Sequence, residues 1–240
     1  MSGHSKWSTI KRQKGITDSK RSASFTKLAR LITVAAKLGG GDPGMNFKLR
    51  LAIDKAKAAN VPKDNIERAI KVGTGEGKDA LTKEVVYEGF GPGGVAVMVE
   101  AITDNSNRTA AEVRNIFTKH GGTMGGQNSV GWMFSRSGVA RIPFSSVPAE
   151  QHESLELQLI DVGATDVREE GDQLVVVCEP DQLNAVQQAL SATGLTPEAD
   201  LEFLPTTMTA VDEATQEKLH GLLEALDELD DVTHVSSNEA

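Results

Sequence analysis

Cysteine, aromatic residues and long apolar runs are all scarce in this 240-residue chain. Its single cysteine, Cys178, excludes an internal disulfide framework and a zinc site built from cysteines, which suits a reducing compartment. Aromatic residues make up 4% of the sequence, so its cores must consist mainly of Leu, Ile, Val and Ala. No apolar stretch approaches the roughly 20 residues that span a bilayer, and the N-terminus lacks the apolar centre of a secretory signal. A composition of 39% hydrophobic and 25% charged residues is typical of a soluble globular protein.

Basic residues are nearly absent from the C-terminal part of the chain. Residues 142–240 contain only Arg168 and Lys218 against 22 Asp and Glu, a net charge of −20. Residues 1–71 have the opposite balance, with 16 Lys and Arg against 5 Asp and Glu, a net charge of +11. The overall net charge of −9 therefore hides a strongly cationic first third. Such asymmetry is typical of a protein that meets a polyanion at its basic end.

The first third of the sequence predicts a basic arm followed by three short helices. The arm, at residues 2–16, combines cations with His4 and Trp7. Apolar residues then recur at helical spacing in segments joined by short turns. Proline suits a first helical position and glycine a helix end, so these residues mark the boundaries. We expect helices at 19–38, at 46–60 and from Pro62 to a stop at Gly73.

The remainder of the sequence mixes strand and helix periodicities. A hairpin is predicted from strands at 84–90 and 95–101, joined by a tight turn at 91–94. A helix is expected at about 107–120. Further strands are expected at 129–135, 138–143, 164–169, 173–179, 199–204, 206–211 and 232–236, and further helices at 149–162, 181–191 and 212–229.

These elements predict a multi-domain α+β protein. Apart from the strand at 84–90, residues 95–236 follow the order β-α-β-β-α-β twice, which is the order of the split-βαβ, ferredoxin-like fold. Two tandem domains fit this order. A nested arrangement fits it equally well, with 138–204 as the insert and 206–236 completing the outer domain. Both arrangements keep the connections short.

Motifs for catalysis, cofactors and metals are missing from the sequence. The glycine-rich stretches at 39–44, 73–77, 89–94 and 121–126 lack the Lys-Ser/Thr ending of a phosphate-binding loop and predict turns and linkers. The five histidines form no close metal-ligand pattern, and no serine lies in a nucleophile elbow. We therefore expect no metal, no cofactor and no enzymatic activity. An enzyme would need residues that the fold brings together from distant parts of the chain.

Five separated motifs resemble the YebC/PmpR family, in the family's order and over essentially the whole chain. They are Gly-His-Ser-Lys-Trp at 3–7, Phe-Thr-Lys-Leu at 25–28, the segment 60–70 that begins Asn-Val-Pro-Lys-Asp-Asn, the segment 87–94 that begins Tyr-Glu-Gly-Phe-Gly-Pro, and Thr-Asp-Asn-Ser-Asn-Arg-Thr at 103–109 with Glu112-Val-Arg114. The stretch 125–132, Gly-Gly-Gln-Asn-Ser-Val-Gly-Trp, follows the family pattern more loosely.

The resemblance implies a three-domain architecture. Family members have an N-terminal three-helix bundle and two ferredoxin-like α/β domains, the third inserted in the second. This implies the nested arrangement, with domains at 1–77, at 78–136 with 205–240, and at 137–204. The N-terminus is basic and rich in serine, as in mitochondrial transit peptides. Because the family's arm begins at Gly3, we expect a bacterial cytoplasmic protein instead.

The resemblance also implies a nucleic-acid-binding regulator of gene expression. The family is described as probable DNA-binding transcriptional regulators, and its mitochondrial members as translational activators. Bacterial members have been tied to relief of ribosome stalling at proline runs. The implied partners are therefore DNA or ribosomal RNA, with the ribosome as a further partner and no membrane partner. The sequence carries no recognition-helix signature, which favours backbone contact, whereas the family description favours DNA.

The candidate contacts follow from the charge pattern and from side-chain chemistry. Lys and Arg supply phosphate affinity, and an exposed Trp or His stacks on a base or ribose. The residues predicted to bind nucleic acid are His4, Lys6, Trp7, Lys11, Arg12, Lys14, Lys20, Arg21, Lys27, Arg30, Arg108 and Arg114. The alternative is a solvated surface on which Trp7 merely anchors the arm. The acidic C-terminal region is interpreted as a solubilising surface, as one that repels nucleic acid, or as one that contacts a basic protein.

Overall fold

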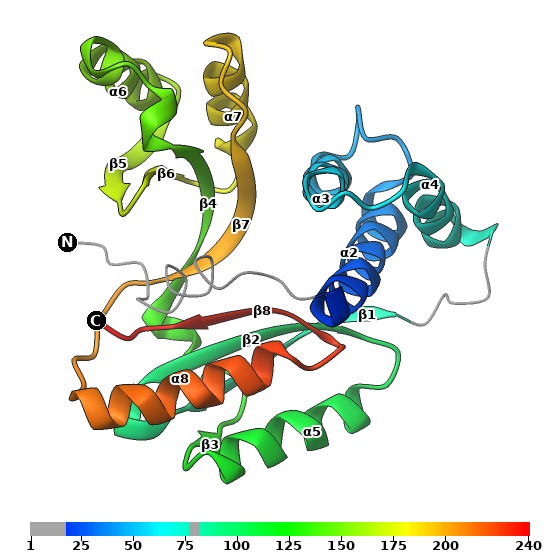
Figure 1. Cartoon of the computed structure of the whole chain (residues 1–240). Coiled ribbons are helices and arrows are strands. Elements are labelled where there is room, and N and C mark those ends of the chain that lie inside the picture. The colour runs from blue at the N-terminus through cyan, green and yellow to red at the C-terminus, as the bar shows by residue number, and fades with distance from the viewer. Residues whose placement is uncertain (1–17, 77–81) are drawn as a thin grey trace. The chain divides into compact units, whose positions relative to one another are not determined.

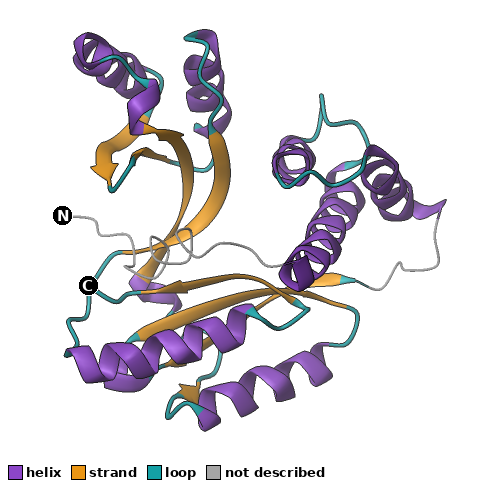
Figure 2. Ribbon diagram, in the orientation of Figure 1, coloured by secondary structure: helices purple, strands orange, loops and turns teal. Residues whose placement is uncertain are grey.

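The computed structural model describes residues 18–76 and 82–240, with side chains described for 24–75 and 82–240. This part of the chain is mixed α+β, with seven α-helices and two four-stranded sheets (Figures 1 and 2). It divides into two compact units. The larger combines the chain up to Phe134 with Pro205–Ala240, and the smaller is Ser135–Leu204.

Three helices open the described part of the larger unit. They are α2 (Asp18–Gly39), α3 (Phe47–Ala58) and α4 (Lys63–Lys71). Their apolar faces share one core, in which Ile32, Leu49 and Ala56 are fully buried. Asn46 caps α3, because its side-chain oxygen accepts a hydrogen bond from the backbone N–H of Leu49. The three helices predicted in this region are confirmed to within two residues at their ends.

The sheet of the larger unit has the strand order β3-β1-β2-β8. Its strands are β1 (Lys83–Phe90), β2 (Ala96–Thr103), β3 (Thr123–Met124) and β8 (Val232–Ser237). β1 pairs antiparallel with β2 and β3, and β2 pairs antiparallel with β8. Two helices pack on one face of this sheet, α5 (Ser106–Lys119) and α8 (Glu213–Asp227) (Figure 1). Phe117, Leu222 and Leu226 are fully buried in the core between these layers.

The hairpin predicted at the start of this sheet is confirmed. Tyr87 of β1 lies opposite Val99 of β2, and the chain reverses at Pro92–Gly94. Gly93 has a φ of 73°, a conformation that favours glycine. A Cβ atom there would also lie 2.8 Å from the side chains of Val211 and Thr215.

Two strands predicted for the larger unit are wrong. Residues 129–133 form a loop and a 3₁₀ turn, and β4 begins only at Phe134, because the carboxylate of Glu88 takes the N–H groups that a ladder would use. Residues 206–211 make an isolated bridge, Thr209 to Glu239, because the side chain of Asn238 holds this segment instead. β1, which lies outside the predicted β-α-β-β-α-β order, occupies the position between β3 and β2.

The smaller unit contains six elements in the predicted order β-α-β-β-α-β. They are β4 (Phe134–Pro143), α6 (His152–Asp161), β5 (Ala164–Glu170), β6 (Gln173–Cys178), α7 (Leu183–Ala192) and β7 (Glu198–Pro205). The sheet order is β5-β6-β4-β7. Val139 and Val175 belong to its core, and Leu159 of α6 and Leu190 of α7 are fully buried. The predicted element order is therefore confirmed for this unit.

A buried ion pair lies inside the smaller unit. Arg141 on β4 is 3% exposed and Glu202 on β7 is 4% exposed. Both terminal guanidinium nitrogens of Arg141 donate hydrogen bonds to the Glu202 carboxylate, and one of these bonds has a length of 2.7 Å. Burial disfavours the charged guanidinium, but the charge and the hydrogen bonds of Glu202 hold the pKa of Arg141 above its usual value. Each buried charge is therefore tolerated only while its partner is present.

We expect Glu202→Gln to lower the free energy of unfolding by about 3 kcal/mol, because it leaves a buried guanidinium without a counter-charge. The double variant Arg141→Met/Glu202→Leu should lie within about 1 kcal/mol of the parent, since neither charge is then buried. Urea denaturation measures both values. Glu198→Gln, an exposed change on the same strand, is the matched control. A single variant as stable as this control would contradict the prediction.

Cys178 on β6 should react slowly in the native protein. Burial raises the pKa of its thiol to about 11, and the thiol donates to the backbone oxygen of Gly138 at 3.6 Å. Because the thiolate is the reactive form, a disulfide reagent at pH 8 should label it only after unfolding. The same protein in denaturing urea provides the full signal, and immediate labelling in native buffer would contradict this expectation.

Candidate nucleic-acid interface

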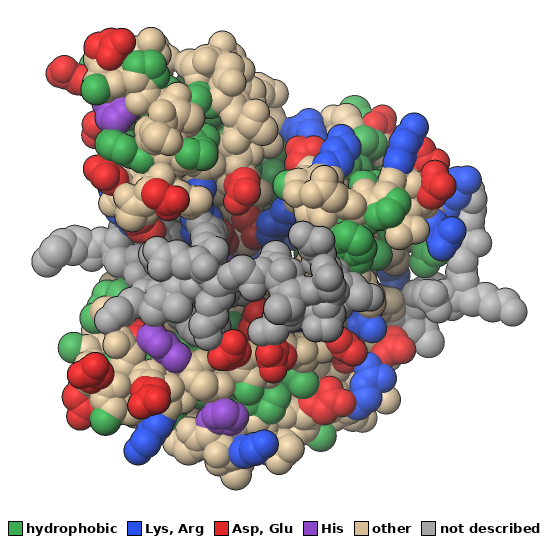
Figure 3. All heavy atoms as spheres, in the orientation of Figure 1, with side chains coloured by type: hydrophobic (Ala, Val, Ile, Leu, Met, Phe, Trp, Pro, Cys, Tyr) green, Lys and Arg blue, Asp and Glu red, His purple; other side chains and the backbone are tan. Residues whose placement is uncertain are grey.

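The cations of α3 and α4 point away from the core that the three N-terminal helices share. Five of them are exposed, and we call this set the α3–α4 basic surface: Lys48, Lys57, Lys63, Arg68 and Lys71. In Figure 3, Lys and Arg side chains gather over these two helices. Two weak surface ion pairs lie within it, Lys57 with Asp54 at 3.9 Å and Lys63 with Glu67 at 3.5 Å. The surface therefore remains cationic and accessible to phosphate groups.

Most of the residues predicted from the arm lie outside the described residues. These are His4, Lys6, Trp7, Lys11, Arg12 and Lys14. Lys20 and Arg21 lie on α2, in the part whose side chains are not described. The roles of all eight residues stay predictions.

Lys27 and Arg30, also on α2, contact the segment that precedes β8. The Lys27 ammonium donates to the backbone oxygen of Asp227 at 2.5 Å. Arg30 donates to the backbone oxygen of Asp230 at 2.9 Å and to the carboxylate of Asp231 at 2.7 Å. Both side chains are about half-buried, so any phosphate contact would involve only their remaining exposed surface.

The Asp231 carboxylate is shared by two arginines. It is 4% exposed, and its second oxygen accepts hydrogen bonds from Arg108 and from the Thr109 hydroxyl, each at 2.7 Å. Burial opposes its ionisation. The hydrogen bonds from Arg108 and Thr109 and the charges of Arg108 and Arg30 nevertheless hold the pKa of Asp231 below its usual value. The bond to Asp231 correspondingly raises the pKa of Arg108.

The Asp231 cluster therefore joins two of the predicted contact residues, Arg30 and Arg108. A phosphate group that bound either one would compete with a buried carboxylate at short hydrogen-bonding distance. Arg114 is exposed on α5, but it lies six residues after Arg108, which places it about 240° around the helix. The fold does not bring Arg114 to this cluster. The contribution of these three residues to nucleic-acid binding stays a prediction.

The α3–α4 basic surface was missed in the list of candidate residues, although its signal was present in the sequence. Arg50 and Lys57, and likewise Lys48 and Lys55, recur at helical spacing on the flanks of the apolar positions. That spacing predicts outward-facing cations. The ion pairing of Arg30 and Arg108 had no such signal, because Asp231 is more than 120 residues away from both.

The described residues contain neither a cluster of metal ligands nor a membrane-spanning helix. No group of three or more His, Cys, Asp or Glu that could hold a metal ion occurs within residues 18–76 and 82–240. Within the same ranges, no helix is long and apolar enough to cross a bilayer.

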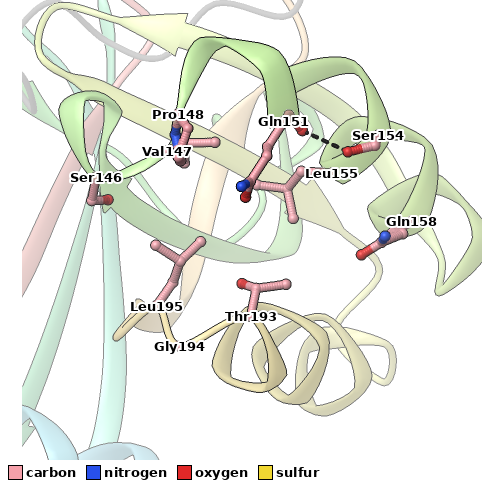
Figure 4. Close-up of a pocket in the computed structure, with 10 residues that line it drawn as sticks. All are labelled: Ser146, Val147, Pro148, Gln151, Ser154, Leu155, Gln158, Thr193, Gly194 and Leu195. Carbon is pink, nitrogen blue, oxygen red and sulfur yellow. Dashed lines mark hydrogen bonds between the residues drawn. The ribbon is translucent and has the colours of Figure 1, made fainter.

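A hollow of about 370 Å³ lies in the smaller unit, between α6 and the end of α7 (Figure 4). Its polar lining includes Gln151, Ser154, Gln158 and Thr193, and the Ser154 hydroxyl donates to the Gln151 backbone oxygen at 3.0 Å. No residue of the lining carries a charge, so the hollow offers no charged side chain to a phosphate group or a metal ion.

Two family models match the chain. The N-terminal domain of TACO1/YebC proteins matches residues 5–76, and the TACO1/YebC second and third domain matches residues 82–239. A "Probable transcriptional regulatory protein" of Rubrobacter xylanophilus is 50% identical over 240 residues, covering 99% of this chain and 95% of the relative. One of Trichlorobacter lovleyi is 48% identical over 239 residues, with the same coverage.

A solved structure is also similar. The crystal structure of a conserved hypothetical protein, Aq1575 from Aquifex aeolicus, has a TM-score of 0.85 and 44% sequence identity. The match covers 93% of this chain and 91% of that chain.

We expect Asp231→Asn to lower the free energy of unfolding by about 2–3 kcal/mol, because Arg30 and Arg108 lose their shared counter-charge. Asp230→Asn, an exposed neighbour with the same change of charge, should stay within about 0.5 kcal/mol. The native pKa of Asp231 lies below the value of about 3.9 for an unfolded chain, so its contribution is complete above that pH. The contribution is lost as the pH falls through the lower, native pKa.

Urea denaturation between pH 7 and pH 3 tests this expectation. The difference between the parent and Asp231→Asn should be constant near neutrality and shrink at the acidic end. Equal stability of the two Asn variants at pH 7 would show that the shared carboxylate does not hold this region together.

Proposed function

Because the chain belongs to the TACO1/YebC family, we propose that it is a regulator of gene expression that binds nucleic acid through the α3–α4 basic surface and the basic arm. The observation that carries this proposal is the accessibility of five cations on two helices whose other faces are buried. The names of the relatives, probable transcriptional regulatory proteins, support the regulatory role.

The charge distribution supports contact with the phosphate backbone. Exposed Lys and Arg that neutralise phosphates release condensed counterions, which gives affinity without reading bases. The net charge of −20 over residues 142–240 repels a polyanion from the other end of the sequence. A polyanion is therefore attracted by the N-terminal helices and repelled by the acidic residues.

Two targets are consistent with this chemistry. The relatives' names favour a transcriptional regulator, whose target would be DNA. A ribosome-associated translation factor, acting on stalled ribosomes, is favoured by the charge separation, because an RNA-lined site would receive the basic helices while the acidic surface faces outward. The first requires selectivity for a promoter, and the second requires association with ribosomes.

We further infer three domains from the order of the elements. The three N-terminal helices would form a bundle within residues 1–77, followed by an outer α/β domain at 78–136 with 205–240 and an inserted one at 137–204. The element order and the strand order β5-β6-β4-β7 support a ferredoxin-like type for the inserted domain. The outer domain also has two helices and a four-stranded sheet, but β1 occupies the position between β3 and β2, and residues 206–211 form no strand.

We also propose that the protein acts in the cytoplasm as a binding protein rather than an enzyme, without a metal or cofactor. The family placement and the single cysteine support the reducing compartment. The regulatory names of the relatives support a binding role.

Removing charge from the α3–α4 basic surface should weaken nucleic-acid binding and flatten its salt dependence. In the variant Lys48→Gln/Lys57→Gln/Arg68→Gln/Lys71→Gln, each lost phosphate contact should reduce the slope of log K against log salt by about 0.7–0.9. Fluorescence anisotropy with labelled oligonucleotides between about 50 and 200 mM salt measures the slope. Lys119→Gln/Lys218→Gln, two exposed cations on α5 and α8, is the control. An unchanged slope in this variant with four substitutions (the fourfold variant) would show that the α3–α4 basic surface does not contact phosphate groups.

Gradient sedimentation with ribosomes, run beside competition binding to promoter DNA, separates the two targets. Ribosome cosedimentation that the fourfold variant loses, together with only non-specific DNA binding, would support the translation factor. Promoter binding that survives a large excess of competitor DNA, without cosedimentation, would support the transcriptional regulator. If the parent protein binds neither ribosomes nor DNA, the proposed function is wrong.

A further inference from the structure

Trp132 is an exposed tryptophan in a chain that has only two. Its exposed fraction is 68%, and it follows a glycine-rich loop in the segment between β3 and β4. Exposing a large aromatic ring to water has a free-energy cost, because burial of a ring contributes strongly to folding. Trp132 is not part of the α3–α4 basic surface, so phosphate binding by that surface does not explain why the ring is exposed.

The loop before Trp132 is held by a single residue of β1, Glu88. The Glu88 carboxylate accepts three backbone hydrogen bonds, from Asn128 and Val130 at 2.8 Å and from Gly131 at 2.7 Å. The Glu88 backbone oxygen accepts a fourth from Gly125, also at 2.8 Å. Because Glu88 is only 7% exposed, these bonds are shielded from water and fix the backbone of the loop.

Both neighbours of Trp132 are also fixed. Gly131 donates to Glu88, and a Cβ atom there would lie 3.4 Å from the Glu88 carboxylate oxygens. The backbone N–H of Met133 donates to Val130 at 2.8 Å, and its backbone oxygen accepts from the N–H and the hydroxyl of Thr206 at 2.8 and 3.0 Å. The main chain at Trp132 is therefore preorganised, while its ring projects into solvent.

The chain segment that carries Trp132, residues 121–133, contains neither a charged side chain nor a wide exposed apolar area. Residues 121–133 include no Asp, Glu, Lys or Arg. Glu88 itself is covered by three N–H donors, so its charge is screened from an approaching anion. Among the described side chains of 121–134, Val130 and Phe134 are buried, and Met124 and Met133 are half-buried. A protein partner would require a much larger contact area, of about 800 Å² on each side.

The loop offers an exposed aromatic ring and, four and five residues earlier in the sequence, two exposed amide side chains. Gln127 and Asn128 are exposed, and their side chains can donate to and accept from the edge of a base. Aromatic side chains stack on unpaired bases, and neither the stack nor the amide contacts require a cation. Bases in a duplex are already stacked on each other and do not offer a free face.

We propose that Trp132 is a stacking platform for an unpaired base of single-stranded nucleic acid. This proposal rests on the proposed function, since the α3–α4 basic surface supplies the phosphate affinity. It adds a contact that senses strandedness, which phosphate binding alone does not do. Both RNA loops and melted DNA contain unpaired bases, so both classes of strand belong in the test.

The experiment uses Trp132 as its own probe. In a Trp7→Phe background, Trp132 is the only tryptophan of the full-length protein. Titration with a 12-nucleotide oligouridylate, the matching oligothymidylate and a 12-base-pair duplex should quench Trp132 emission with at least one single strand, and much less with the duplex. Anisotropy of fluorescein-labelled versions of the same oligonucleotides reports binding independently of quenching.

Substitution of the ring should affect affinity but not salt dependence. We expect Trp132→Ala to weaken binding of the quenching strand by about tenfold with an unchanged salt slope, and Trp132→Phe to keep most of the affinity. Leu157→Ala, which removes another exposed apolar side chain, is the matched control and should bind as the parent does. Because Trp132 is exposed and its ring supports none of the loop's hydrogen bonds described above, the Ala variant should fold normally.

The outcomes separate the two proposals. Quenching by one or both single strands supports stacking and identifies the kind of strand that the site accepts. Salt-dependent binding without quenching, or with full affinity in Trp132→Ala, overturns the stacking proposal and leaves the phosphate-binding function intact. Equal quenching by the duplex overturns the preference for unpaired bases. Absence of binding to every oligonucleotide, by the parent protein as well as in the Trp7→Phe background, overturns the proposed function, and the stacking proposal with it.

Discussion

The larger unit depends on the burial of one charged group, the Asp231 carboxylate. Its apolar residues form two separate cores, one among the three N-terminal helices and one between the sheet, α5 and α8. The hydrogen bonds from Lys27 and Arg30 of α2 to the segment before β8 lie between these cores, and Arg108 and Thr109 reach the same carboxylate from α5. A carboxylate that is 4% exposed is tolerated only with such partners. The basic helices are therefore connected to the sheet through charge.

The sequence predicted the elements whose determinants are local. Helical spacing and the residues at helix ends located α2, α3 and α4, and the glycine-rich turn at 91–94 located the first hairpin. The predictions at 129–135 and 206–211 were wrong because side chains compete there for the backbone groups of a strand. Glu88 is about 40 residues from its loop, and Asn238 is about 30 residues from Thr207, whose backbone oxygen accepts from the Asn238 side chain. Local pattern contains no information about partners at such distances.

The same distinction applies to the candidate site. The outward direction of Lys48 and Lys57 follows from helical periodicity alone, so the α3–α4 basic surface could be predicted. The ion pair of Arg30 could not be predicted, because its partner, the Asp231 carboxylate, lies 201 residues away in sequence. The charge count of a segment states how many cations it has, whereas the fold decides which of them are available to a ligand. Arg30 and Arg108 already form ion pairs with the Asp231 carboxylate, with which a phosphate group would have to compete.

Two buried carboxylates, Asp231 and Glu88, have different kinds of hydrogen-bond donor as partners, and this difference matters in a protein that we propose to bind a polyanion. Asp231 is neutralised by guanidinium groups, which consumes cations that would otherwise attract phosphate. Glu88 is stabilised by hydrogen bonds from backbone N–H groups, which use no cation and order a loop instead. The second arrangement orders a segment, residues 121–133, that has no charged side chain of its own and carries the exposed ring of Trp132. Phosphate affinity and base stacking can thus reside on separate parts of the sequence, because the carboxylates near them are satisfied by different donors.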